Sequence, residues 1–356
     1  MGGIGPSAAD LDAVAAALGP RCQRHVPVGP RTTYRVGGAA ALFLEAQDVA
    51  DLLAIAPAVQ GNDVPVVVLG RGSNLLVADA GFPGLVVTLA GPRFGSIELP
   101  SGTRGAAAVV DAAGEGSGDP RYRVRAGGAV ALPVLARQTA AAGLTGLEWA
   151  VGVPGSVGGA VRMNAGGHGA DTRATLRRCW LVELRRGTRV TRSVDQLGLG
   201  YRRSSVTPDQ VVVEAEYQLA PGDREASEAT IRDIARWRRE HQPGGQNAGS
   251  VFVNPTGVAP ANSAGWLVDA AGLKGHRHGT ASVSTKHANF ILADPDGSAD
   301  DVVALMVEVQ GLVSQRLGVV LHPEVRLLGF PEQLTSTLGL GQSDRRDGRQ
   351  EPDRDT

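Results

Sequence analysis

Apolar residues recur with helical spacing in five stretches of the chain. The stretch at 48–59 begins with an acidic residue, and the stretch at 132–142 ends at Gly143, a residue that commonly follows a helix C-terminus. The stretch at 224–240 is charged along one face, which is typical of an amphipathic surface helix. We therefore predict helices over 10–18, 48–59, 132–142, 224–240 and 300–317.

Shorter runs of apolar, largely β-branched residues predict strands. The clearest follows Pro65, and the whole set is 41–45, 66–69, 75–77, 82–89, 124–126 and 319–328, with alternating strands and turns over 176–219. The stretch 101–119 is rich in Gly and Ala, so 91–121 is interpreted as a loose strand pair with an insertion. Because the strands are short and irregularly spaced, an α+β fold is favoured over a regular doubly wound sheet.

The chain of 356 residues is long enough for two or three domains. We predict a lead-in over 1–19, a domain over 20–225 with lobes at 20–90 and 91–225, and an α+β C-terminal domain over 226–332. Residues 333–356 are polar and charged, which predicts a disordered tail.

Composition narrows the class of protein. The formal net charge of −1 gives no reason to expect a nucleic acid or a membrane as partner, and no apolar run approaches the roughly 20 residues of a membrane helix. The N-terminus lacks the features of a signal peptide, and the two cysteines favour a reducing compartment, so we expect a cytoplasmic protein. The histidines show no ligand spacing, so no metal is expected.

The first chemically informative segment is 68–76, in which a Gly-rich turn joins two apolar runs. Consecutive backbone N–H groups in such a turn can bind an anion, and Ser and Asn side chains add donors. The third Gly of a dinucleotide fingerprint is missing, and a strand follows in place of a helix. A plain strand-to-strand turn remains an alternative. The candidate residues are Gly70, Arg71, Gly72, Ser73 and Asn74.

A second and longer Gly-rich segment spans 146–167. Its glycines are interleaved with Trp149, Val151, Val153 and Met163, which a flexible linker would lack. A backbone of this kind suits close contact with a ligand, although a Gly-rich β crossing would also explain it. The candidate residues are Gly152, Pro154, Gly155, Ser156, Gly159, Ala160, Asn164, Ala165 and Gly166.

Together the two segments resemble the FAD-binding fold of vanillyl-alcohol-oxidase-type flavoenzymes. The string Gly-Val-Pro-Gly-Ser-Val-Gly-Gly-Ala, followed by Asn-Ala-Gly, resembles the UDP-N-acetylenolpyruvoylglucosamine reductase family, and the likeness extends over about 32–329. It implies that 20–225 is a two-lobed FAD-binding domain and that 226–332 binds substrate. The two segments would hold the pyrophosphate of a non-covalent FAD, with 164–166 along the flavin.

Three further motifs carry candidate catalytic residues. Arg202 lies beside Tyr201 after a Gly turn, where a guanidinium suits a carboxylate or phosphate, although an exposed strand-end Arg would look the same. Ser250 precedes an apolar run, and no Gly-x-Ser-x-Gly elbow is present to suggest a hydrolase. Glu324 lies in an apolar run, where it is costly unless functional or paired with Arg326.

The resemblance assigns chemistry to these three residues. It implies reduction of UDP-N-acetylglucosamine enolpyruvate by NADPH through FAD, in peptidoglycan precursor synthesis and hence in cell shape and division. Arg202 and Glu324, the latter as the neutral acid, would stabilise the negative charge that follows hydride addition. Ser250 would donate the proton that completes the product.

The substrate diphosphate contacts are less defined. The resemblance implies Tyr201 and Asn254 as substrate contacts, but the chain has His241 and His287 where some members carry Lys and Gln. Lys274 and Lys286, the only two lysines, are further candidates, and we favour Lys274 and His287. Surface side chains without a role are the alternative for all four.

Other functions stay open at this point. An FAD oxidase of the same fold would lack the Ser250 and Glu324 motifs and would react quickly with oxygen. A sugar-nucleotide binding module would contain no flavin. The sequence does not determine the oligomeric state, for which a monomer is the working expectation.

Overall fold

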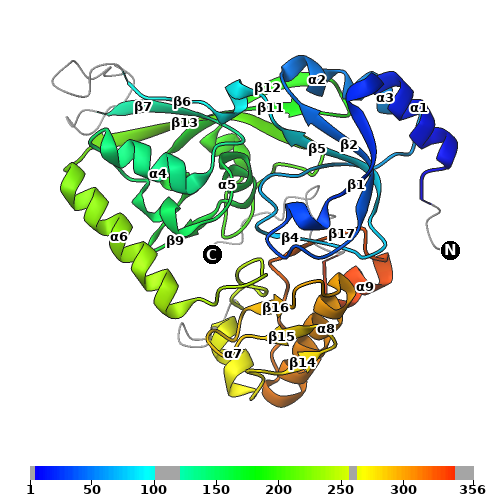
Figure 1. Cartoon of the computed structure of the whole chain (residues 1–356). Coiled ribbons are helices and arrows are strands. Elements are labelled where there is room, and N and C mark those ends of the chain that lie inside the picture. The colour runs from blue at the N-terminus through cyan, green and yellow to red at the C-terminus, as the bar shows by residue number, and fades with distance from the viewer. Residues whose placement is uncertain (1–4, 101–120, 256–262, 341–356) are drawn as a thin grey trace, which may run out of the picture. The chain divides into compact units, whose positions relative to one another are not determined.

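The computed structural model describes residues 5–100, 121–255 and 263–340, and these form two compact units (Figure 1). Unit 1 comprises Met1–Val26, Ala40–Ser73 and Pro83–Gln242, and unit 2 comprises Pro27–Ala39, Asn74–Phe82 and Pro243–Thr356. The units differ from the predicted domains in two respects. The helix at 224–241 belongs to unit 1, and two N-terminal segments belong to unit 2.

A four-stranded sheet forms one part of unit 1. Its order is β1 (Cys22–Pro27), β2 (Ala39–Ala46), β5 (Phe82–Leu89) and β3 (Val66–Val68), and β3 and β5 run parallel. The helices α1 (Ala8–Leu18), α2 (Val49–Leu53) and α3 (Ile55–Val59) contribute to the same core. The apolar side chains of β2 and β5 are largely buried, which explains why the sequences of these two central strands are almost continuously apolar.

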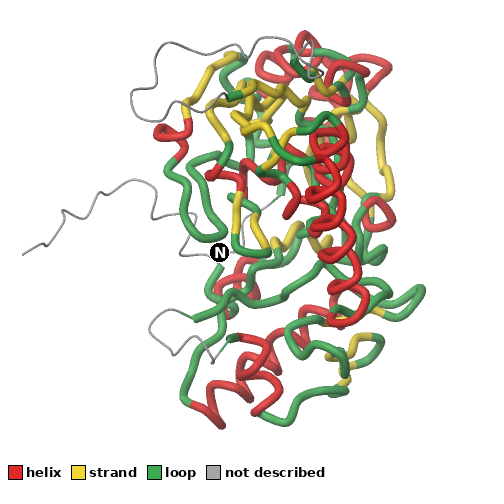
Figure 2. Tube along the Cα trace, turned by 90° about the vertical axis from the view of Figure 1, so that its left-hand side faces the viewer, coloured by secondary structure: helices red, strands yellow, loops and turns green. Residues whose placement is uncertain are grey.

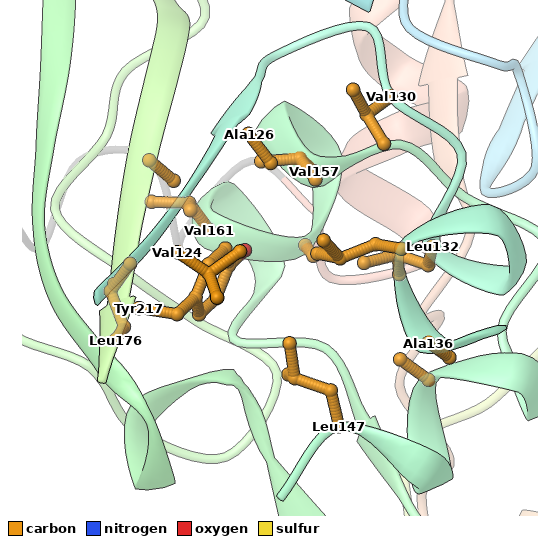
Figure 3. Packing of buried hydrophobic residues seen from close by; sticks show 14 of the residues in the cluster. Val124, Ala126, Val130, Leu132, Ala136, Leu147, Val157, Val161, Leu176 and Tyr217 are labelled. Atoms are coloured by element: carbon orange, nitrogen blue, oxygen red, sulfur yellow. The ribbon is translucent and has the colours of Figure 1, made fainter. Parts of the chain in front are cut away.

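A larger antiparallel sheet forms the rest of unit 1. Its order is β12 (Thr188–Ser193), β11 (Leu176–Glu183), β13 (Gln210–Pro221), β7 (Tyr122–Gly127) and β6 (Ile97–Glu98), with β8 (Leu144–Thr145) at the end of β13. The helices α4 (Leu132–Ala141), α5 (Val157–Met163) and α6 (Arg224–His241) share its core. Figure 3 shows Val157 and Val161 of α5 packed near Val124 of β7 and Tyr217 of β13.

Short elements complete unit 1. They are the strand pair β9 (Gly166–Gly167) and β10 (Ala170–Asp171), and the 3-10 turns Gly19–Arg21, Pro92–Gly95, Glu148–Gly152, Thr172–Ala174 and Val194–Leu197. The helix α6 packs in unit 1 because Ile231 and Ile234 on its apolar face are buried in the core shared with α4. This contact explains why α6 does not begin the C-terminal unit.

Unit 2 has a three-stranded sheet of β14 (Arg277–His278), β15 (Ala281–Val283) and β16 (Ile291–Ala293), and a parallel pair of β4 (Leu75–Val77) and β17 (Arg326–Leu328). Its helices are α7 (Ala264–Ala270), α8 (Ala299–Leu317) and α9 (Glu332–Thr337), with a 3-10 turn at Gly29–Arg31. Figure 2 shows that long loops connect these elements.

The two N-terminal segments of unit 2 are held there by named contacts. Asp79 accepts hydrogen bonds from the N–H groups of Ala299 and Asp300 at the start of α8, at 3.0 and 3.1 Å. Tyr34 and Val36 are buried in the same core as α8. Long-range contacts of this kind are not visible in a local sequence pattern, which is why the predicted boundary at residue 226 misses them.

Most predicted elements are confirmed, and three differ. The predicted helix at 48–59 is divided into α2 and α3 at Ala54, where Pro57 cannot supply the N–H needed to continue the helical ladder. The predicted strand at 319–328 is reduced to β17. The predicted disordered tail begins too early, because α9 is folded and Leu338 is fully buried. Residues 341–356 and the insertion at 101–119 lie outside the described residues.

None of the helices in the described ranges is long and apolar enough to cross a membrane.

An ion-pair cluster on the larger sheet should contribute to stability. Glu216 on β13 lies directly opposite Arg178 on β11 and Arg125 on β7, with N–O distances of 2.9 Å to both. Its side chain is 4% exposed. Although burial acts to raise the pKa of Glu216, hydrogen bonds from the two arginines lower it below its ordinary value.

Replacing Glu216 by Gln should therefore destabilise the protein in a pH-dependent way. The lowered pKa means that the carboxylate stabilises the fold above its ordinary pKa of about 4.3 and loses this effect as the pH falls through the folded-state pKa. We expect a loss of about 1–3 kcal/mol at pH 7, below the value for a fully buried pair because the arginines are partly exposed. Urea unfolding between pH 3 and 7 measures this.

A matched control is Glu228→Gln, which removes an exposed pair with Arg224 on α6 and should change little at any pH. A deficit in Glu216→Gln that stays constant from pH 7 down to pH 3 would contradict the proposed role of the carboxylate charge.

Candidate active site

The two Gly-rich segments lie against each other in unit 1. A Cβ atom added at Gly70 would be 2.9 Å from the Oγ of Ser156, and one added at Gly155 would be 3.4 Å from the Oγ of Ser73. Gly70 and its neighbour Arg71 are exposed, as is Pro154. A glycine at position 70 is therefore required for the close approach, and accessible backbone is present on both segments.

The helix α5 begins immediately after this contact. Ser156 is buried and caps the helix, because its Oγ accepts a hydrogen bond from the N–H of Gly159 at 3.3 Å. The N–H groups of Val157 and Gly158 donate to the carbonyls of Val130 and Gly128, both at 2.9 Å. This part of the second segment is thus fixed by its own backbone hydrogen bonds, so it offers a ligand a rigid surface.

Not every glycine of the second segment faces open space. A Cβ atom at Gly158 would lie 3.2 Å from the carbonyl oxygens of both Gly128 and Val212, so Gly158 is required for packing on the sheet. A Cβ atom at Gly152 would lie 3.2 Å from Ile234 of α6. These two glycines have structural reasons to be small, whereas Gly155 meets nothing closer than an ordinary van der Waals contact.

Glu148 anchors the start of the second segment and was not predicted as a site residue. Its carboxylate accepts hydrogen bonds from the backbone N–H of Gly146 at 2.8 Å and from Ser227 Oγ of α6 at 2.6 Å. Burial acts to raise the pKa of Glu148, but these hydrogen bonds lower it below its usual value. The carboxylate therefore links α6 to the Gly-rich backbone.

Asn164 and Arg202 are linked through two loops of unit 1. The buried Asn164 adopts a left-handed conformation, and its Nδ2 donates to the Gly200 carbonyl at 3.0 Å and to Asp171 at 2.9 Å. Arg202 also has a positive φ of 56°, and its Nη1 donates to the Gly166 carbonyl at 3.0 Å. Such strained backbone is often found at functional sites. The amide of Asn164 is thus engaged with protein groups.

Tyr201 lies next to this arginine and is 61% exposed. The guanidinium of Arg202 lies 5.3 Å from the centre of the Tyr201 ring, within the range of a cation–π contact. The pair presents an aromatic face and a fixed positive charge on the same loop.

The segments that carry Ser250 and Glu324 are joined in unit 2 through Val251. The carbonyl of Val251 accepts a hydrogen bond from the N–H of Glu324 at 2.7 Å, and Ser250 directly precedes Val251. Asn74 joins them, because its Nδ2 donates to the Glu324 carbonyl at 3.0 Å. Three predicted site residues that are far apart in the sequence therefore form one cluster.

Glu324 is not part of a strand. The predicted strand over 319–328 would instead have placed Glu324 and Arg326 on the same strand face. It lies between an isolated bridge, Phe252 to Pro323, and the start of β17 at Arg326. Both chain neighbours of Glu324 are buried, while its own side chain is only partly covered.

The residues expected to bind the substrate diphosphate lie around α7, with Asn254 and His287 at its start and Lys274 at its end. Asn254 accepts a hydrogen bond from the N–H of Ala264 at 3.0 Å, and a Cβ at Gly265 would lie 3.1 Å from the His287 ring. Lys274 pairs with Asp269 at 2.6 Å and is close enough to His287 to act on it electrostatically. Burial lowers the pKa of His287, and the positive charge of Lys274 lowers it further.

The internal hydrogen bond of His287 defines its tautomer. Its Nδ1 accepts from the backbone N–H of Asn289 at 3.2 Å, so the proton of the neutral ring lies on Nε2. The ring can therefore act as an uncharged Nε2–H donor.

The predicted site residues are divided between the units. The residues Gly70–Ser73, Gly152–Gly166, Tyr201 and Arg202 belong to unit 1, and Asn74, Ser250, Asn254, Lys274, His287 and Glu324 belong to unit 2.

Comparison with known proteins agrees with this arrangement. Residues 40–191 match the model of the FAD binding domain, and residues 241–328 match the model of the UDP-N-acetylenolpyruvoylglucosamine reductase C-terminal domain. The chain is 40% identical over 316 residues to the UDP-N-acetylenolpyruvoylglucosamine reductase of Rubrobacter xylanophilus, covering 88% of this chain and 97% of the relative. It is 38% identical over 331 residues to that of Synechocystis sp., covering 91% and 96%.

A solved structure gives the same answer. The crystal structure of UDP-N-acetylenolpyruvylglucosamine reductase from Thermus caldophilus superposes with a TM-score of 0.69 at 31% identity, covering 86% of this chain and 99% of that chain. The expected α+β fold, with an FAD-binding domain and a C-terminal reductase domain, is confirmed. The chain belongs to the UDP-N-acetylenolpyruvoylglucosamine reductase family.

Proposed function

We propose that this protein reduces UDP-N-acetylglucosamine enolpyruvate to UDP-N-acetylmuramate with electrons from NADPH, using FAD as its cofactor. Family membership over nearly the full length of the relatives supports the reaction. The observation that supports the assignment of the site is the backbone hydrogen bond from the N–H of Glu324 to the carbonyl of Val251, the residue next to Ser250, since it brings together the two segments that carry the groups the chemistry needs.

The residues of unit 1 fit an FAD pyrophosphate. Gly70 and Gly155 lie where the two Gly-rich segments approach each other, and a Cβ atom added at Gly70 would lie only 2.9 Å from the Oγ of Ser156. The hydroxyls of Ser73 and Ser156 lie at the same contact. We assign Gly70–Asn74, Gly152–Ala160 and Asn164–Gly166 to the cofactor. When bound, FAD would take a hydride from NADPH and supply it to the methylene carbon of the enolpyruvyl group.

The protein side chains then stabilise the negative charge of the intermediate and supply the proton that completes the product. Hydride addition leaves negative charge on the carbon next to the methylene group and on its carboxylate. The guanidinium of Arg202, held by the Gly166 carbonyl, and the carboxyl of Glu324 in its protonated form stabilise this charge. The hydroxyl of Ser250 donates its proton to the same carbon, and a water or basic group must return a proton to the serine.

A separate set of protein side chains suits the sugar nucleotide. Asn254, Lys274 and His287 around α7 supply an amide, an ammonium and an Nε2–H donor, which suit the oxygens of a diphosphate. Tyr201 offers an exposed ring beside Arg202. We assign these four residues to substrate binding.

The reaction product is a peptidoglycan precursor, so the protein serves cell-wall synthesis and through it cell shape and division. We place it in the cytoplasm, where NADPH and sugar nucleotides are available, and two free cysteines agree with a reducing compartment. A monomer is our expectation for the oligomeric state.

A coupled assay tests the proposed function. Purified protein with FAD should oxidise NADPH only when UDP-N-acetylglucosamine enolpyruvate is present, and should form UDP-N-acetylmuramate in equal molar amount. NADPH oxidation that proceeds with oxygen and without the enolpyruvyl compound would instead indicate an oxidase.

A further inference from the structure

Asn289 is buried beside the segment that carries Ser250 and has no assigned role. Its side chain is 4% exposed and lies in the apolar run Ala288-Asn289-Phe290-Ile291. A buried amide is costly unless its donors and acceptor are satisfied, so its hydrogen bonds indicate what it does.

The hydrogen bonds of Asn289 go to two consecutive residues that follow Ser250. Its Oδ1 accepts from the Phe252 N–H at 3.0 Å, and its Nδ2 donates to the Phe252 carbonyl at 2.8 Å. Its own backbone carbonyl accepts from the Val251 N–H at 2.8 Å. The Asn289 side chain thus makes the hydrogen bonds that a neighbouring β-strand would make to Phe252. The Asn289 carbonyl does the same for Val251.

This arrangement leaves the backbone next to Ser250 with little freedom. Val251 is held on one side by Asn289 and on the other by the N–H of Glu324. Ser250 itself follows Gly249, whose φ of 79° lies in the left-handed region that glycine adopts without strain and whose N–H donates to the Oδ1 of Asn247 at 3.0 Å. The orientation of the Ser250 hydroxyl therefore depends on how firmly positions 251 and 252 are fixed.

We propose that Asn289 is a positioning residue for proton donation by Ser250. The inference rests on the proposed function, because it assigns to Asn289 the task of holding the Ser250 hydroxyl in line with its acceptor carbon. Proton transfer is sensitive to displacement of the donor, and a shift of about 1 Å can cost on the order of 100-fold in rate.

The test compares Asn289→Ala with wild-type holoenzyme in the two half-reactions, measured by stopped-flow absorbance without oxygen. Reduction of FAD by NADPH should change less than about threefold, while reoxidation by the enolpyruvyl substrate should slow by about 10–100-fold. In D₂O the solvent isotope effect on reoxidation should increase, because proton donation becomes more rate-limiting. Wild-type reoxidation in Asn289→Ala would overturn the proposal.

A double variant separates positioning from general destabilisation. If Asn289 acts through Ser250, adding Asn289→Ala to Ser250→Ala should slow reoxidation only a few-fold further, whereas independent effects would multiply. Multiplying effects would overturn the proposal. Gln310→Ala is the matched control, since it removes another buried amide of unit 2, bonded to the Leu321 carbonyl, and should lower the melting temperature without changing the isotope effect.

The same experiment shows which of the two proposals fails, if one does. Ser250→Ala reoxidised at the wild-type rate would refute the role of Ser250 in the proposed function. Slow Ser250→Ala with fast Asn289→Ala would refute only the positioning role. Because the alanine variant leaves two buried groups of Phe252 unbonded, Asn289→Asp provides a second variant. It keeps the Oδ1 acceptor and, when its carboxyl is protonated, a donor to the Phe252 carbonyl, so it should recover part of the lost rate at low pH.

Discussion

Ser250→Ala should slow reoxidation of the reduced enzyme by UDP-N-acetylglucosamine enolpyruvate by about 10²–10⁴-fold, the range typical for loss of a general acid. Reduction of FAD by NADPH should stay nearly unchanged, because it requires no proton from this serine. The reason is local: Ser250 lies next to Val251, whose carbonyl is bonded to the N–H of Glu324, so its hydroxyl belongs to the segment that is tied to Glu324. Rapid-mixing absorbance measures both half-reactions.

A second serine of the same unit provides the control. Ser314 on α8 is partly buried and its substitution by Ala should leave both half-reactions as they are in the wild type. Equal losses in the two half-reactions of Ser250→Ala would exclude Ser250 as the proton donor and would indicate disturbed cofactor binding.

Gly155→Val should yield a protein that is folded but nearly free of flavin. A Cβ at this position meets no protein atom closer than 3.4 Å, so the fold can accept it, but a branched side chain would project where the two Gly-rich segments approach each other. We expect the flavin content of the purified protein to fall below about one tenth of wild type, because backbone approach to the pyrophosphate is blocked. The ratio of visible to protein absorbance measures this content.

Gly95→Val is the matched control in the same unit. No atom lies within 4 Å of a Cβ at Gly95, which is exposed, so the variant should keep its FAD. A fully loaded Gly155→Val protein with a wild-type melting temperature would mean that the pyrophosphate binds elsewhere.

The local pattern of apolar and polar residues is sufficient to predict most helices and strands of this protein. The strand at 82–89 and the helix that ends at Leu317 agree with their predicted positions, since both have a long apolar period. The sequence predicted one helix over 48–59 where the structure has two, because one proline within an otherwise helical pattern can either begin or break a helix. Unit boundaries were missed because they depend on long-range contacts such as Asp79 with α8.

The candidate site was predicted from its motifs, but its supporting residues were not. Ser250 and Glu324 could be named from sequence, whereas Val251 and Asn289, which hold them, have no distinctive motif. Asn289 had one available signal, a polar residue in an apolar run, which is the same argument that was applied to Glu324. Glu148 has a similar supporting role, and its partner Ser227 is distant in sequence, so the pairing could not be seen beforehand.

The visible absorption spectrum, recorded without oxygen, tests the central claim most directly. The purified protein should show a flavin spectrum that bleaches on addition of NADPH and returns on addition of UDP-N-acetylglucosamine enolpyruvate. A protein that stays colourless after incubation with FAD, or a bleached flavin that returns only when oxygen is admitted, would contradict the claim that this chain is an FAD-dependent reductase of the enolpyruvyl sugar nucleotide.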